Sequence, residues 1–172
     1  SRAGKTRYAG CSNHAGWQLL KALPISERLG IARYISQQIN YSLLARDAEH
    51  ELVPCGLDQR VGIMAWSPLQ SGLLSGKFRR GQPKPSESRL NTLELPGTID
   101  EERLFRIVDV LAEIAGQRGV PVSQVALNWV TPKPPVHTVI LGARHEKPPP
   151  PHPHPPPRPH HAPTRGRPRH PH

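Results

Sequence analysis

Cysteine and long apolar runs are scarce in this chain of 172 residues. Its two cysteines, Cys11 and Cys55, form no CxxC pair and show no other metal-binding spacing. We expect both to be small hydrophobic residues without a disulfide between them. No run of 18 apolar residues and no signal-peptide pattern occurs. These absences predict no membrane partner and favour a soluble, cytoplasmic protein.

Acidic residues are absent from residues 148–172, which hold four arginines, six histidines and twelve prolines. The chain carries a net charge of +10, and removing those four arginines leaves +6 on residues 1–147. The basic balance therefore comes partly from one segment, and no specific nucleic-acid partner is predicted. Without hydrophobic periodicity, residues 148–172 are predicted to form a disordered tail after a domain of residues 1–147.

The length suits one domain with a hydrophobic core. A complete eight-fold α/β barrel needs roughly 250 residues, more than this chain has. Because the sequence starts at Ser1, directly before a strand-like run, we expect a fragment or a processed product.

Strand-like and helix-like segments alternate along the chain. The expected strands are residues 7–11, 31–39, 61–67 and 136–141. The expected helices are residues 17–29, 47–57, 98–118 and 123–130. Pro24 is expected to kink or split the first helix, Thr98 and Glu101 to form a capping box, and Gly119 to end the third helix. Residues 68–96 are expected to form a long loop.

This alternation predicts four parallel βα units of the α/β class, with the third strand buried on both faces. Such a sheet would leave two unpaired edges and an exposed inner surface. We therefore expect self-association through these half-barrel surfaces.

Four motifs end the predicted strands in turn. They are RYAGCSN at 7–13, QINYSLLAR at 38–46, AWSPLQSGLLSGK at 65–77 and VILGAR at 139–144. Together they resemble the last four strand-to-loop junctions of the aldo-keto reductases, over about residues 4–147. The resemblance implies the C-terminal half of a (β/α)8 TIM barrel that binds NADPH (NADP). It also implies reduction of small carbonyl substrates, aldehydes and ketones, to alcohols.

The resemblance assigns three polar residues to the nicotinamide carboxamide: Ser12, Asn13 and Gln38. Amide and hydroxyl groups suit this role because they offer both donors and acceptors. The alternative is a helix N-cap for Ser12 and Asn13, and a satisfied polar side chain for Gln38. Trp66 is implied to pack against the nicotinamide ring, with a place in the core as its alternative.

The segment from Ser67 to Lys77 carries the most specific part of the resemblance. Its implied cofactor-binding residues are Ser67, Pro68, Leu69, Gly72 and Lys77. Glycine lets the backbone approach the pyrophosphate, and lysine places a cation nearby. The alternative is a glycine-rich surface loop.

Gly142 and Arg144 complete the implied cofactor site, with the Arg144 guanidinium against the 2′-phosphate of NADPH. The sequence then departs from the family. Pro148 and His152 stand where the family has a Gln and an Asn that contact adenine, so adenine recognition is unassigned.

No catalytic residue is assigned to this chain. The family's catalytic Asp, Tyr, Lys and His belong to earlier strands, and Tyr8, Tyr34 and Tyr41 lie in other segments. We therefore expect this chain alone not to reduce carbonyl compounds.

The tail leaves three interpretations open. A frame error from residue 148 onward is favoured, over chelation of a soft metal by the histidines or nonspecific RNA contact by the arginines. No metal site is assigned. For the whole chain, the alternatives to a reductase are a catalytically dead NADPH- or partner-binding fragment and a basic, His-rich interaction protein.

Overall fold

The computed structural model describes residues 4–83 and 100–142. Contacts divide the chain into two units, residues 1–141 and 142–172, and every helix and strand below belongs to the first. The predicted tail, residues 84–96 of the predicted loop at 68–96, and Thr98 lie outside the described residues.

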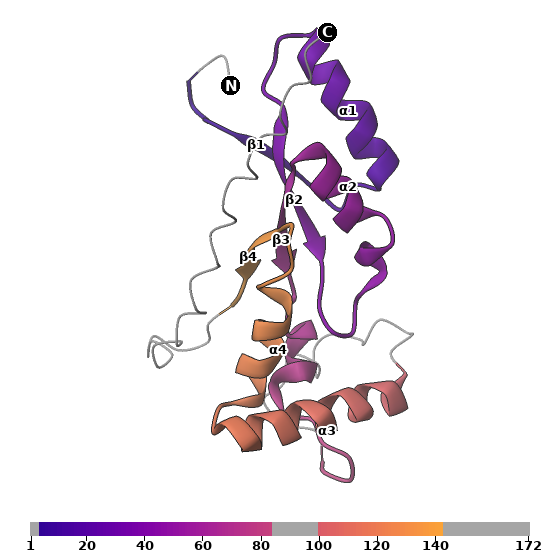
Figure 1. Ribbon diagram of the computed structural model, residues 1–172, viewed down its shortest axis with the longest axis vertical. Helices are drawn as coiled ribbons and strands as arrows, with labels where there is room; N and C mark the ends of the chain where they lie inside the picture. Colours follow the sequence, from indigo (N-terminus) through magenta and orange to yellow (C-terminus); the bar gives the residue numbers. More distant parts are fainter. Residues whose placement is uncertain (1–3, 84–99, 143–172) are drawn as a thin grey trace, which may run out of the picture. The chain divides into compact units, whose positions relative to one another are not determined.

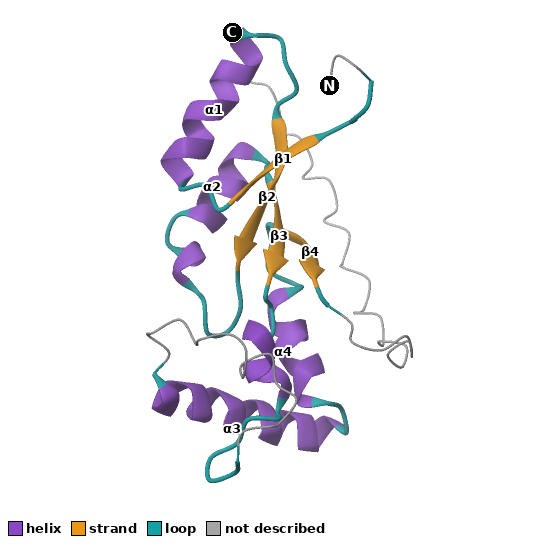
Figure 2. Cartoon of the chain, turned by 180° about the vertical axis from the view of Figure 1, so that it is seen from behind, coloured by secondary structure: helices purple, strands orange, loops and turns teal. Residues whose placement is uncertain are grey.

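Four parallel strands form one sheet in chain order: β1 (Ala9–Ser12), β2 (Tyr34–Asn40), β3 (Gly62–Trp66) and β4 (Val136–Ile140) (Figures 1 and 2). The helices between them are α1 (Gly16–Arg28), α2 (Leu52–Gln59), α3 (Glu101–Arg118) and α4 (Val122–Val130). Two 3-10 helices, η1 (Asp47–Glu49) and η2 (Gln70–Ser75), complete the described elements. The α/β class with parallel βα units is confirmed.

The two faces of the sheet differ in burial. The helix-covered face carries residues at most 8% exposed: Cys11, Gln37, Ile39, Ile63, Ala65 and Val136. The opposite face, which we call the open face, carries half-buried or exposed residues: Ser12, Gln38, Asn40, Met64, Trp66 and Thr138. The prediction that β3 is buried on both faces is therefore wrong. Four strands supply only half the side chains that fill a closed eight-stranded barrel, so the open face has no opposite wall among the described residues.

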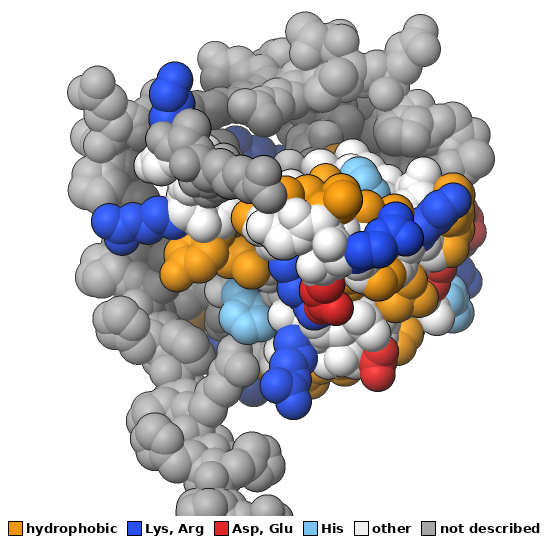
Figure 3. Space-filling view, turned by 90° about the horizontal axis from the view of Figure 1, so that it is seen from above, with side chains coloured by type: hydrophobic (Ala, Val, Ile, Leu, Met, Phe, Trp, Pro, Cys, Tyr) orange, Lys and Arg blue, Asp and Glu red, His pale blue; other side chains and the backbone are white. Residues whose placement is uncertain are grey.

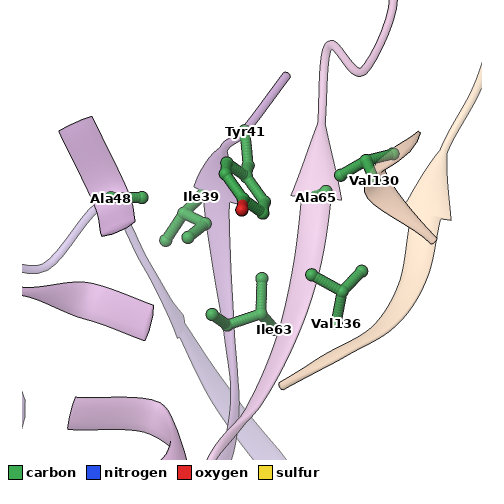
Figure 4. Close-up of a cluster of buried hydrophobic side chains, with 7 residues drawn as sticks. All are labelled: Ile39, Tyr41, Ala48, Ile63, Ala65, Val130 and Val136. Carbon is green, nitrogen blue, oxygen red and sulfur yellow. The ribbon is translucent and has the colours of Figure 1, made fainter. Parts of the chain in front are cut away.

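Three hydrophobic clusters hold the described fold together, and the third packs Cys11 of β1 against Leu19 and Leu23 of α1 and against Val61. The first joins strands β2, β3 and β4 to η1 and α4 through Ile39, Tyr41, Ala48, Ile63, Ala65, Val130 and Val136 (Figure 4). The second lies between η2, α3 and α4 and centres on Leu73, Leu74 and Val108. Burying each such aliphatic side chain contributes about 1.5–3 kcal/mol, so these clusters position the strand ends.

Helix α1 runs through Pro24 without interruption, so the predicted split is wrong. Proline removes the N–H that would bond to the carbonyl of Leu20. Both residues are exposed, while Leu19 and Leu23 on the other face are buried. Water can therefore satisfy the Leu20 carbonyl, and the helix continues.

The single helix predicted at residues 47–57 is two elements, η1 and α2. Pro54 explains the break. In α2 it is the third residue, where an N–H has no partner within the helix. A helix starting at Asp47 would place Pro54 where its N–H is required.

Two predictions for residues 68–118 are corrected. Within the predicted loop, η2 forms and buries Leu73 and Leu74. The N-cap of α3 is Asp100 rather than Thr98: its Oδ1 accepts hydrogen bonds from the N–H groups of Glu102 at 2.9 Å and Arg103 at 3.2 Å. Gly119 ends α3 in a left-handed conformation, as predicted.

Candidate functional site

Strand register brings three predicted site residues to one end of the open face. Ser12 lies opposite Gln38 in the β1–β2 pairing, and Asn40 lies opposite Trp66 in the β2–β3 pairing. All lie at or near the carboxyl ends of their strands, the end where parallel α/β folds bind ligands. The predicted convergence of Ser12, Gln38 and Trp66 therefore has a structural basis.

Asn13 turns the chain out of β1. Its φ of 53° is left-handed, a conformation that asparagine tolerates better than most residues. Its N–H donates to the carbonyl oxygen of Gln38 at 3.0 Å, and the Ser12 hydroxyl donates to the same oxygen at 3.3 Å. The N-cap of α1 is Ala15, whose N–H donates to Gln18 at 2.8 Å. The N-cap interpretation of Ser12 and Asn13 is thus wrong.

The Trp66 indole N–H donates to Oδ1 of Asn13 at 3.0 Å. This bond joins β3 to the end of β1 and crosses the carboxyl end of β2, which lies between them. Trp66 is half-buried on the open face and belongs to none of the three hydrophobic clusters. The core interpretation of Trp66 is therefore not supported.

Gln38 has a half-buried side chain whose amide makes no hydrogen bond to any residue in 4–83 or 100–142. Its amide thus remains available to a ligand or to solvent. Two residues further on, Asn40 has a buried Oδ1 that also finds no partner among the described residues. Sequence reasoning missed Asn40, although the two-residue period of a strand places it on the face of Gln38.

These open-face residues fit a planar ring that carries an amide. Gln38 offers an unpaired amide, Asn13 an amino group, and Trp66 a half-buried aromatic surface. Hydrogen-bond donors and acceptors thus lie beside the flat apolar surface of an aromatic ring. Such an arrangement can orient a nicotinamide.

The chain turns sharply twice after β3, once before η2 and once within it. Ser67 and Gly72 have φ values of 50° and 99°, and only glycine adopts the latter readily. Pro68 is buried and Leu69 packs against the second hydrophobic cluster, whereas Lys77 is exposed. The surface-loop alternative is therefore wrong for the buried part of this segment.

The last two predicted site residues follow β4. Gly142 is exposed, and Arg144 lies outside the described residues.

A cavity of about 430 Å³ opens beside this site and shares Asn13 and Asn40 with it. Its remaining lining comes from the residues before α1, the end of β2, and the segment that leads into α2: His14, Ala15, Ile39, Ala45, Asp47, Ala48, Glu51 and Leu52. No sequence motif marks this cavity, because its lining comes from three separate segments.

A polar network fixes the chain after β2. Arg46 forms an ion pair with Glu49, with Nη2 and Oε2 2.7 Å apart. The Arg46 guanidinium carbon lies 5.3 Å from the centroid of the Trp129 ring, and the Lys133 ammonium lies 4.4 Å from the same centroid. The Arg46 hydrogen bonds hold the pKa of Glu49 below its ordinary value, and the Tyr41 hydroxyl adds to this effect. Burial, reinforced by Glu49, raises the pKa of Tyr41. The network thus joins η1 to α4.

Residues 4–83 and 100–142 meet the requirements of neither a metal site nor a membrane-spanning helix. This part of the chain groups no three His, Cys, Asp or Glu side chains in a way that could hold a metal ion. None of its helices combines the length and apolarity needed to cross a bilayer. Cys11 and Cys55 are both free, and burial raises the pKa of each thiol.

A four-stranded parallel sheet with polar side chains at the carboxyl ends of its strands defines an α/β protein of the kind that binds ligands at that edge. The sequence profile of the aldo/keto reductase family matches residues 1–148. The chain belongs to the aldo/keto reductase family, and its sheet corresponds to part of that family's barrel.

Relatives support the assignment. An uncharacterized oxidoreductase of Bacillus subtilis, YrpG, is 36% identical over 143 residues, covering 83% of this chain and 42% of the relative. A probable voltage-gated potassium channel subunit beta of Arabidopsis thaliana is 34% identical, with 81% and 43% covered. Versiconal hemiacetal acetate reductase of Aspergillus parasiticus is 29% identical, with 80% and 40% covered. The chain thus spans about two fifths of the length of these relatives.

Proposed function

We propose that this chain is the NADPH-binding part of an aldo/keto reductase that acts on small carbonyl compounds. The observation that carries the proposal is the meeting of Ser12, Asn13, Gln38 and Trp66 at the carboxyl end of one parallel sheet. Family membership supports the reaction class, since reduced nicotinamide supplies the hydride in such reactions.

The proposed division of roles follows residue chemistry. Ser12, Asn13 and Gln38 would orient the carboxamide, and Trp66 would cover one face of the nicotinamide ring. The backbone at Ser67, Pro68, Leu69 and Gly72 would lie along the pyrophosphate, with Lys77 as its counter-charge. Gly142 and Arg144 would serve the 2′-phosphate, which favours NADPH over NADH.

We assign no catalytic residue to the 172-residue chain, and we expect it to bind cofactor without reducing a carbonyl compound. The domain is proposed to extend through Lys147. Two free thiols suit a reducing compartment such as the cytoplasm.

Cofactor titration followed by NADPH fluorescence tests this function. Replacing the unpaired amide in Gln38→Ala should weaken binding about tenfold, the effect of losing roughly 1.4 kcal/mol. Gln117→Ala, on the exposed face of α3, is the matched control and should leave binding unchanged. Absence of binding to the unmodified chain, or equal affinities for all three proteins, would refute the proposal.

We also propose a second copy of the chain as partner. β1 and β4 are the edges of the described sheet, and Tyr8 before β1, Trp17 in α1 and Ile35 in β2 are 72%, 62% and 46% exposed. Apolar side chains reach the surface among Lys and Arg side chains on the face shown in Figure 3. Rotation about an axis parallel to the strands would place β4 of one copy beside β1 of the other with strand direction kept.

A further inference from the structure

We infer that Trp66 is a positioning residue through its indole N–H: it fixes the amide of Asn13 so that only the amino group faces a ligand. This inference rests on the proposed function, since it names how one side of that site is oriented. A covering role for the Trp66 ring alone would need no N–H.

The chemistry of the contact sets the orientation of Asn13. An indole N–H can only donate, so the Asn13 atom at 3.0 Å must be the carbonyl oxygen. Rotating the amide by 180° would set two donors against each other and break this bond. Trp66 therefore selects one of the two amide orientations that an isolated asparagine could adopt.

The backbone reinforces this selection. Asn13 holds a left-handed φ of 53°, and its N–H is already bonded to the Gln38 carbonyl. Only the side-chain torsions of Asn13 remain to be fixed, and the indole bond fixes them. Among the residues described, Nδ2 of Asn13 has no partner, so it is available to a ligand.

As a consequence, the two sides of the site offer different hydrogen-bonding groups to a ligand. Oδ1 of Asn13 faces the indole, so on the side away from Trp66 this amide offers only its Nδ2 donors, while the unpaired Gln38 amide offers a donor and an acceptor. A ligand must therefore place an acceptor, such as a carbonyl oxygen, against Asn13. A ring whose substituent presents only donors on that side would be rejected.

Nuclear magnetic resonance of the indole N–H groups tests the bond in the full 172-residue chain. The sequence has three tryptophans, so Trp66→Phe identifies the Trp66 signal by its loss. Asn13→Gly removes the acceptor without straining the left-handed backbone. We expect it to shift the Trp66 indole signal and to speed its hydrogen exchange about tenfold or more. Asn13→Asp, which keeps an acceptor, should restore slow exchange.

NADPH titration separates positioning from ring packing. Trp66→Phe keeps an aromatic ring but loses the N–H, and should weaken NADPH binding about fivefold to tenfold. Asn13→Asp keeps the indole bond but cannot donate to the ligand, so it should bind NADPH at least as weakly as Asn13→Gly.

The two measurements distinguish failure of this inference from failure of the proposed function. An indole signal unchanged by Asn13→Gly, or unchanged NADPH affinity in Trp66→Phe, overturns the inference. An indole bond that responds as expected in a chain that binds no NADPH supports the positioning bond and overturns the proposed function instead.

Discussion

The hydroxyl of Tyr41 donates a 2.8 Å hydrogen bond to Oε1 of Glu49, eight residues away. Tyr41 is 1% exposed, and its ring packs edge-on against Trp129 at 5.6 Å. Glu49 also accepts three hydrogen bonds from Arg46. This carboxylate thus ties Tyr41, directly after β2, to Arg46 at the start of η1, and both of these residues pack against Trp129 of α4 beside the proposed site.

Glu49→Gln should lower the free energy of unfolding by about 1–2 kcal/mol, because it removes the ion pair and weakens the bond to a buried hydroxyl. Urea unfolding followed by circular dichroism measures this change. Glu27→Gln is the matched control, since Glu27 and Arg33 form an exposed pair at 3.1 Å. The control should change stability by less than about 0.5 kcal/mol, and equal effects at both sites would contradict the role of Glu49.

Acid should weaken the same network. The folded pKa of Glu49 lies below the ordinary value of 4.5, so its contribution is present above that pH. It is lost as the pH falls through the folded pKa, where the carboxylate takes up a proton. The stability difference between the unmodified chain and Glu49→Gln should therefore shrink between about pH 4.5 and pH 2. A difference that stays constant over this range would argue against the carboxylate as its source.

Pro24→Ala should stabilise the chain by roughly 1–3 kcal/mol, because it restores an N–H in the interior of α1 on an exposed face. Thermal unfolding measures the gain. Pro54→Ala is the matched control: Pro54 occupies the first turn of α2, where an N–H has no partner in the helix, so its replacement should be nearly neutral. Equal gains in stability at both prolines would show that the position of a proline within its helix does not determine how much it destabilises the chain.

Self-association should appear in sedimentation velocity as a mass that rises with concentration. Tyr8→Lys combined with Trp17→Glu places charges on the exposed β1 side and should shift the chain toward monomer. Val110→Lys changes an equally exposed apolar residue on α3, 55% accessible, and serves as control. A monodisperse monomer of the unmodified chain at all concentrations would refute the proposed partner.

Local sequence patterns predicted the strands to within a few residues. Runs such as Val61–Ser67 are apolar and β-prone, and glycines such as Gly119 mark helix ends. Pro54 and Asp100 carried enough local information to correct the helix boundaries, since each acts within one turn. The family motifs likewise placed Ser12, Gln38 and Trp66 at strand ends.

Contacts between residues far apart in the chain could not be predicted from local sequence patterns. The bond between Asn13 and Trp66 joins residues 53 positions apart, and no local pattern encodes it. The exposure of Met64 and Trp66 depends on what covers the open face, whereas their apolar character alone suggested full burial. The cavity beside Asn13 is lined by three separate segments, so it can be recognised only once the fold is known.

The unequal faces of the sheet have a consequence for how this sequence can vary. Along β3, Ile63 and Ala65 are fully buried, so a change of one methylene there alters packing on the helix side. Met64 and Trp66, which alternate with them, are half-buried. A saturation library of β3 scored for solubility should therefore show a two-residue stripe, with intolerant positions at Ile63 and Ala65. New ligand preferences can be selected at the permissive positions between them without rebuilding the scaffold.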